Sequence, residues 1–308
     1  MTKKLFFIIT IGLIIFTGCT QNKESSAADT VLQVLIPESA APVLIAQVDS
    51  FKALRPELAP SLSFSVLQSE ETIVQFTRNN ARLIFTTRKL SSEEKHLVSD
   101  NPQDIDEVLV AYDAIAVITH GKIRTAQVST DELQGILTGT ITRWEQLEHA
   151  NGTSGRIKVI LQDSSDVAAY LKGRLLREKP LRNDFHRTNS SAMTALAVDA
   201  TPQGIGFVAL SWVDTINTNI RVLKLTEKEA LTDTLYQVAE LARGQYFLPH
   251  PANIFRKFYP LRQAVYLYAR VERKIIVPSF SRYVTSKGQR YFLYKGLLPA
   301  AQPIRLGS

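Results

Sequence analysis

Short hydroxyl side chains and one arginine occupy three loops in which the sequence predicts that a strand is followed by a helix. These residues are Ser39 in the first loop, Thr86, Thr87 and Arg88 in the second, and Ser164 and Ser165 in the third. Hydroxyls, backbone N–H groups at helix N-termini and guanidinium groups all donate hydrogen bonds to a group that only accepts them, such as a tetrahedral oxyanion. We therefore predict a small anion site formed by these loops.

The hydroxyls also have a structural interpretation. Ser39, Ser164 and Ser165 each precede a helical pattern, where a serine hydroxyl accepts a hydrogen bond from a backbone N–H of the first turn. Thr87 is equally consistent with an ordinary hydroxyl at the end of a strand. Helix capping and ligand binding both stay open for these residues at this point.

Two charged residues of the same loops have several interpretations. Arg88 either binds the anion or pairs with Glu93 or Glu94 at the surface. Asp166, which follows Ser165, would repel an anion unless it accepts the proton that hydrogen phosphate carries, and it would then help to reject fully ionised sulfate. Alternatively, Asp166 is a solvent-facing charge at a helix N-terminus, or it marks a loss of affinity for phosphate.

The elements that position these loops alternate between strand and helix patterns. Apolar, β-rich segments at 31–36, 62–67 and 82–87 each precede a helical pattern, and the same order returns after 157–161. A further strand is predicted at 204–210. This alternation predicts an α/β fold.

Capping residues mark several predicted helix starts. Ser91 with Glu94 and Ser129 with Glu132 have the spacing of capping boxes, in which the two residues satisfy each other's backbone N–H groups. Ser69 is predicted to cap the helix that follows the second strand. These starts fix where the strand-to-helix loops end.

The N-terminus has the pattern of a secretory signal. Lys3 and Lys4 precede an apolar run at 5–17, which is 13 residues long. A membrane-spanning helix needs roughly 20 residues, so a cleaved signal at 1–18 is favoured over a membrane span. Cleavage after such a run predicts an exported protein.

Cys19 is the only cysteine of the chain, and it ends the segment Phe16-Thr17-Gly18-Cys19. This segment resembles the lipobox of bacterial lipoproteins, which implies lipidation of Cys19, although ordinary signal cleavage with a free thiol is the alternative. Residues 19–30 then form the lipidated Cys and a polar, flexible tether. We expect a protein anchored by lipid to the bacterial cell envelope, on the periplasmic side or at the outer membrane.

The composition is that of a globular chain with a moderately basic surface. The formal net charge is +7 and 45% of the residues are hydrophobic, which is sufficient to form the cores of two lobes. Nucleic acid is a poor partner for an exported chain. We therefore interpret the positive charges as a solvated face that attracts anions.

The sequence contains no enzyme motif with the spacing that catalysis requires. The S-x-x-K and S-D-N patterns at 92–95 and 99–101 are nearly adjacent instead of lying on separate parts of a fold, and no K-T-G element follows. The five histidines are scattered and no H-E-x-x-H or C-x-x-C motif occurs. We predict no catalytic residues, no metal site and no cofactor.

Several segments resemble, in order, the PstS-like phosphate-binding proteins of ABC transporters, especially the lipoprotein branch of Bacteroidetes-type bacteria. The segment LTGTITRW at 137–144 is the most specific of them. The others are PESAAPVL at 37–44, ARLIFTTRKLSSEE at 81–94, AYDAIAVI at 111–118, QGIGFVALSW at 203–212, PLRQAVYLY at 260–268 and GQRYFLYKGLLPA at 288–300.

The resemblance implies a periplasmic-binding-protein-like (type II) fold, in which two crossover hinge strands join two α/β lobes. Lobe 1 is placed at 31–109 plus 213–308, and lobe 2 at 110–212. It also implies a monomer that captures inorganic phosphate or a similar oxyanion between the lobes and delivers it to an ABC transporter permease. The alternative is a PstS-shaped lipoprotein with altered or lost phosphate binding that serves as an interaction or sensory subunit.

Overall fold

The computed structural model describes residues 31–216, 218–229, 237–271 and 275–301. The predicted signal, Cys19 and the tether lie outside the described residues. Within the ranges given, we find no helix that combines the length and the apolar character needed to cross a membrane.

The strands form one large mixed sheet and a small separate pair. Their bounds are β1 Leu32–Pro37, β2 Leu62–Leu67, β3 Leu83–Thr86, β4 Ile105–His120, β5 Gln127–Ser129, β6 Lys158–Gln162, β7 His186–Thr188, β8 Gly204–Ala209, β9 Ile220–Val222, β10 Lys224–Thr226, β11 Arg262–Arg270 and β12 Leu298–Pro299. The large sheet has the order β2-β1-β3-β11-β4-β8-β6-β7, with β12 and β9 also paired to β4, while β10 pairs with β5.

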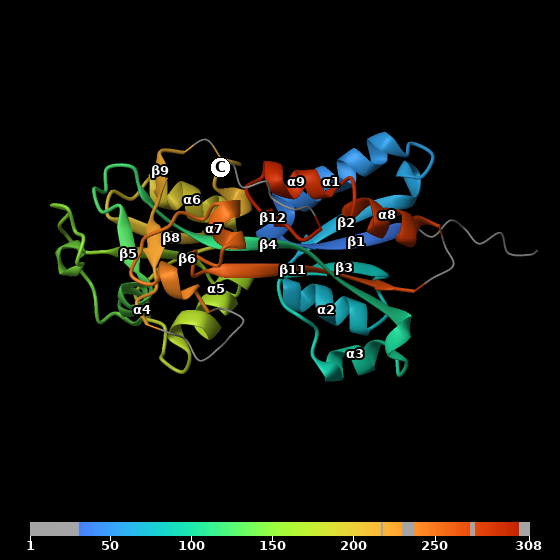
Figure 1. The fold of residues 1–308 in the computed structure, drawn as a ribbon, viewed down its shortest axis with the longest axis horizontal. Coiled ribbons are helices and arrows are strands. Elements are labelled where there is room, and N and C mark those ends of the chain that lie inside the picture. Colours follow the sequence, from blue (N-terminus) through green and yellow to red (C-terminus); the bar gives the residue numbers. More distant parts are fainter. Residues whose placement is uncertain (1–30, 217, 230–236, 272–274, 302–308) are drawn as a thin grey trace, which may run out of the picture. The chain divides into compact units, whose positions relative to one another are not determined.

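The long strand β4 joins the two parts of the large sheet. Its first half pairs with β11 and its second half pairs with β8, both antiparallel. Figure 1 shows β4 and β11 running together through the middle of the fold. The sequence predicts two strands here, at 108–110 and 114–119, but a single strand forms because its residues find ladder partners along the whole length.

Helices cover the sheet. Their bounds are α1 Ala41–Leu54, α2 Ser69–Thr77, α3 Ser92–Val98, α4 Thr130–Thr138, α5 Asp166–Leu171, α6 Ser191–Asp199, α7 Pro251–Phe255, α8 Ile276–Val284 and α9 Gln289–Tyr294. Both predicted capping boxes are confirmed, at Ser91 for α3 and at Ser129 for α4. Ser165 caps α5 by accepting a hydrogen bond from the N–H of Ala168.

Two predicted caps are wrong. Ser39 lies inside a short 3-10 helix, Glu38–Ala40, and Ala40 is the N-cap of α1. Ser69 is the first residue of α2 rather than its cap, which is Gln68. The physical reason is the same at both positions, because the two hydroxyls donate to the carboxylate of Asp166 instead of accepting from their own helix.

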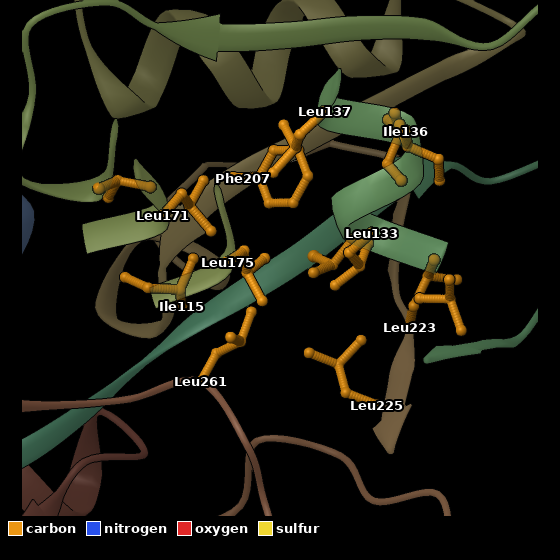
Figure 2. Close-up of a cluster of buried hydrophobic side chains, with 14 of the residues drawn as sticks. Ile115, Leu133, Ile136, Leu137, Leu171, Leu175, Phe207, Leu223, Leu225 and Leu261 are labelled. Carbon is orange, nitrogen blue, oxygen red and sulfur yellow. The ribbon is translucent and has the colours of Figure 1, made fainter. Parts of the chain in front are cut away.

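The core consists of separate hydrophobic clusters on the two parts of the sheet. One cluster contains Val34, Phe51, Phe85 and Phe280 beside β1, β3 and β11. Figure 2 shows another, in which α4, α5 and β8 contribute side chains. Complete burial of one such side chain contributes about 1.5–3 kcal/mol.

Residues from late in the chain contribute to the cluster of Figure 2. They include Leu223, Leu225 and Leu261, which Figure 2 labels, and Tyr259. All four belong to the segment that the sequence analysis places in lobe 1, yet they pack against Ile115 of β4 and its neighbours. The lobe boundaries therefore stay a prediction. The packing shows that part of the segment 213–308 shares a hydrophobic core with residues of 110–212.

Candidate anion-binding site

The carboxylate of Asp166 is surrounded by hydrogen-bond donors from far away in the sequence. Ser69 donates from its backbone N–H to Oδ1 and from its hydroxyl to Oδ2, each at 2.9 Å. The hydroxyl of Ser39 donates to Oδ2 at 3.0 Å. Because all three groups are donors directed at one anionic group, they form a small anion site that Asp166 itself fills.

The sheet order explains why these donors meet. Ser39, Ser69 and Thr87 follow β1, β2 and β3, which are parallel neighbours in the sheet. The carboxyl ends of parallel strands share one edge, where α/β folds place their ligands. Thr87 joins the group through Ser69, because its N–H donates to the Ser69 hydroxyl and the two hydroxyls lie 3.1 Å apart.

A cavity of 290 Å³ lies beside this cluster of donors. Residues from β11, from α2 and its neighbouring loops, and from α5 with the turn after it line the cavity. They are Ser69, Glu70, Thr87, Arg88, Asp166, Ala169, Tyr170, Gly173, Arg174 and Gln263. The site is therefore built by both parts of the sheet, and Asp166 is one of the residues that line the cavity.

A second carboxylate makes a similar contact in the opposite direction, from the first part of the sheet to a helix of the second part. Glu38, which follows β1, accepts hydrogen bonds from the backbone N–H and the hydroxyl of Ser191, each at 2.9 Å. Ser191 is the first residue of α6. Each part of the sheet thus offers one carboxylate to a helix N-terminus of the other part, where backbone N–H groups and the helix dipole favour negative charge.

Burial raises the pKa of both carboxyl groups. For Asp166, loss of water is the largest cause, the charge of Glu70 adds to it, and the hydrogen bonds from Ser69 and Ser39 oppose it. For Glu38, burial again raises the pKa and the two contacts with Ser191 oppose it. Their donors therefore offset only part of the cost of removing these charges from water.

Arg88 lines the cavity, but two carboxylates neutralise its charge. Its guanidinium group binds Glu70 at 2.7 and 2.8 Å and Glu94 at 2.7 and 2.9 Å. Arg88 lowers the pKa of Glu94 to about 2. An anion in the cavity consequently meets an arginine whose donors are already engaged.

Comparison with known proteins identifies the family of the chain. The model of the PBP superfamily domain matches residues 22–287. The chain belongs to the PBP superfamily. The phosphate-binding protein PstS of Borreliella burgdorferi is 25% identical over 170 residues, which are 51% of this chain and 58% of that protein. The chain thus matches less than two thirds of that curated relative.

Solved structures of two transport proteins share the fold. A substrate-binding protein from Clostridium perfringens, solved with bound phosphate, has a TM-score of 0.70 at 20% identity and covers 87% of this chain and 99% of its own. An ABC-type phosphate transport receptor from Vibrio cholerae has a TM-score of 0.63 at 15% identity over 88% of this chain and 100% of its own. The family predicted from the resemblance and the α/β fold predicted from the alternation of strands and helices are confirmed.

The structure of this PBP-superfamily chain brings together only some of the residues predicted for the site. Ser39, Thr87 and Asp166 lie in one hydrogen-bonded cluster, and Arg88 lies at the cavity wall. The buried hydroxyl of Thr86 donates to the backbone carbonyl of Arg88. These contacts place the first two predicted loops beside one another.

The third predicted loop contributes differently. Ser165 donates to the carbonyl of Gln162 and caps α5, so its hydroxyl is used within its own loop. Ser164 is exposed, has a positive φ of 55° and is not among the residues that line the cavity. Asp166 is the residue of this loop that reaches the donors.

Sequence reasoning missed Ser69, Glu38 and Ser191 as parts of the site. Ser69 follows a predicted strand and starts a predicted helix, so the rule that selected Ser39 would also have selected it. Glu38 and Ser191 carry no such signal, because their contact depends on the packing of α6 against the loop after β1. Among the described residues, no His, Cys, Asp and Glu side chains gather into a group that could hold a metal ion.

Proposed function

We propose that the protein is an extracytoplasmic solute-binding lipoprotein that captures inorganic phosphate or a similar oxyanion and passes it to the permease of an ABC importer. The predicted signal at 1–18 and lipidation at Cys19 support export and anchoring to the membrane. The Clostridium perfringens protein, solved with bound phosphate, and the phosphate transport receptor from Vibrio cholerae support a phosphate ligand. Binding requires no covalent chemistry, and we propose none.

One observation carries this proposal. The hydroxyl of Ser39 and the N–H and hydroxyl of Ser69 converge on a single carboxylate, as donors do around a bound oxyanion. A carboxylate and an oxyanion both present acceptor oxygens and negative charge, so either satisfies the same donors. We propose that an entering anion takes the place of the Asp166 carboxylate, with Thr86, Thr87, Arg88, Ser164 and Ser165 forming the surrounding loops.

The proposed motion is a hinge closure of two lobes, 31–109 plus 213–308 and 110–212. β4 and β11 run along the middle of the sheet and supply the natural hinge. A site built by residues after β1, β2 and β6 can form only when both parts of the sheet approach each other. We expect a monomer to suffice, because all the donors described come from one chain.

Titration calorimetry of the purified protein tests the ligand. We expect phosphate to bind, and Ser69→Ala to weaken binding by about tenfold or more, because the change removes one donor and leaves an acceptor of the anion unpaired. Ser92→Ala, which removes a hydroxyl from α3 outside the cavity, is the matched control. Absence of heat with phosphate and with other tetrahedral oxyanions would refute the proposal.

The position of Asp166 also favours a second candidate function. An internal carboxylate that already fills the anion donors is what an interaction or sensory subunit without a transported ligand would need. Small-angle scattering separates the two candidates. If saturating phosphate, sulfate, molybdate and vanadate all leave the radius of gyration unchanged, the sensory function is favoured over capture.

A further inference from the structure

The cavity beside the anion donors is larger than an inorganic oxyanion requires. Its volume is 290 Å³. A tetrahedral oxyanion occupies roughly the volume of two to three water molecules, at about 30 Å³ each in the liquid. Most of the cavity is thus left over once an oxyanion lies on the donors of Ser39 and Ser69, which leaves space for a substituent attached to that anion.

Small residues form part of the cavity lining and leave space beside it. Ala169 and Gly173 lie one helical turn apart in α5 and the turn that continues it, and both line the cavity. A Cβ atom added at Gly173 would meet no other atom within 4 Å. The backbone of Gly173 needs no left-handed conformation, so its missing side chain creates space rather than permitting an unusual turn.

One residue of the cavity lining carries a buried acceptor. Gln263 of β11 lines the cavity and is only 4% exposed, and its Oε1 has no hydrogen-bond partner among the described residues. A buried carbonyl without a donor costs about 1–3 kcal/mol. A ligand with a hydroxyl or amino group at this position would supply the missing donor.

We propose that the ligand is a small organic phosphate or phosphonate whose substituent carries a hydroxyl or amino group. The phosphoryl oxygens replace the Asp166 carboxylate at Ser39 and Ser69, and the substituent extends along Gly173 toward Gln263. This inference rests on the proposed anion capture and specifies the class of anion. It assigns Gly173 and Gln263 as the residues that determine specificity.

Calorimetry with glycerol 3-phosphate and inorganic phosphate tests the proposal. We expect the wild-type protein to bind the ester about tenfold more tightly, which corresponds to about 1.4 kcal/mol. Gly173→Leu should fill the space and lower the ratio of ester affinity to phosphate affinity by about tenfold. Lys172→Leu introduces the same side chain at the adjacent exposed position, outside the cavity lining, and should leave the ratio unchanged.

A second variant examines the acceptor. Gln263→Met keeps the length of the side chain and removes its amide, so it should reduce the preference for glycerol 3-phosphate over methyl phosphate, whose substituent has no donor. Equal or tighter binding of inorganic phosphate by the wild-type protein would overturn this inference and leave the capture of an oxyanion intact. Failure of every oxyanion to bind would overturn both.

Discussion

Asp166 accepts two hydrogen bonds from Ser69, one from the backbone N–H and one from the hydroxyl, each at 2.9 Å. These two residues are 97 positions apart in the chain. Because the same donors suit an external oxyanion, Asp166 competes with any ligand for them. Binding is therefore an exchange of one anion for another, and the first two predictions follow from this exchange.

Removal of the competing carboxylate should strengthen anion binding. We expect Asp166→Ala to raise the affinity for sulfate by about tenfold, because the donors of Ser39 and Ser69 no longer have an internal partner. Calorimetry measures the affinity. Asp163→Ala removes a carboxylate of the same loop that pairs with Arg187 outside the site, and it should have little effect. Weaker binding by Asp166→Ala would contradict competition.

Sulfate affinity should rise as the pH falls. Burial holds the pKa of Asp166 above its ordinary value, and a protonated carboxyl group is a weaker acceptor that releases its donors. Sulfate is suitable because its own charge stays constant between about pH 5 and pH 8. Glu70 lies close enough to raise the pKa of Asp166 further, so Glu70→Gln should move the rise to lower pH. A flat profile in the wild-type protein would exclude this linkage.

Arg88 should contribute little to anion affinity. Its guanidinium group is held by Glu70 and Glu94, so it offers the ligand neither a free charge nor a full set of donors. We expect Arg88→Met to weaken phosphate binding by less than about threefold, well below the loss expected for Ser69→Ala. The combined change Glu70→Gln and Glu94→Gln releases the positive charge and should increase affinity. A large loss on Arg88→Met would show that the arginine changes partners when ligand binds.

Asp113 of β4 should make stability depend on pH. Its carboxyl group is fully buried, which raises its pKa to about 7 although the N–H groups of Ala114 and Leu210 oppose the shift. The folded protein therefore binds this proton more tightly than the unfolded chain, and stability falls as the pH rises from about 4 through 7. The loss amounts to roughly 4 kcal/mol at pH 8, as an upper bound.

Asp113→Asn is the test of this linkage, because the amide is neutral at every pH and keeps an oxygen for the N–H of Ala114. We expect its free energy of unfolding in urea at pH 8 to exceed that of the wild-type protein, with the difference vanishing near pH 4. Asp106→Asn, at an exposed position of the same strand, is the control. A variant less stable than wild type at pH 8 would show that Asp113 stays charged.

Replacement of only one partner of the buried ion pair between Arg174 and Glu227 should lower the stability of the protein. The two groups lie 2.6 Å apart, and their side chains are 4% and 5% exposed. Glu227→Leu leaves the charge of Arg174 buried and should lower the free energy of unfolding by about 3–5 kcal/mol. Arg174→Met together with Glu227→Leu should lose less. Equal losses in the two variants would show that the lost packing, rather than the loss of the opposite charge, dominates.

Local signals predicted the elements well. Capping boxes at Ser91 and Ser129 and the apolar strands before the three loops depend on neighbouring residues, so the sequence contains the full pattern. The topology of the large sheet is harder to predict from the sequence, because β4 and β11 pair across more than a hundred residues. No local pattern indicates that β4 is one continuous strand.

The candidate site was predicted in part for the same reason. Ser39, Thr87 and Asp166 could be selected one by one, since each stands at the end of a strand. Their partners could not, because the contact of Glu38 with Ser191 spans 153 positions and arises only when α6 packs near the loop after β1. The sequence contains the chemical groups, and the topology decides which of them meet.

Glu38 and Asp166 each contact a helix N-terminus in the other part of the sheet, and these contacts affect the protein without ligand. Separation of the two parts of the sheet would remove the carboxylates from the N-termini of both α2 and α6. Partial opening would therefore break these hydrogen bonds without forming new ones. The protein can therefore populate a closed form without ligand, and a ligand that displaces Asp166 shifts the balance between the closed and open forms. The measured affinity for an anion is then the difference between the free energy with which the donors bind that anion and the free energy with which they bind the Asp166 carboxylate.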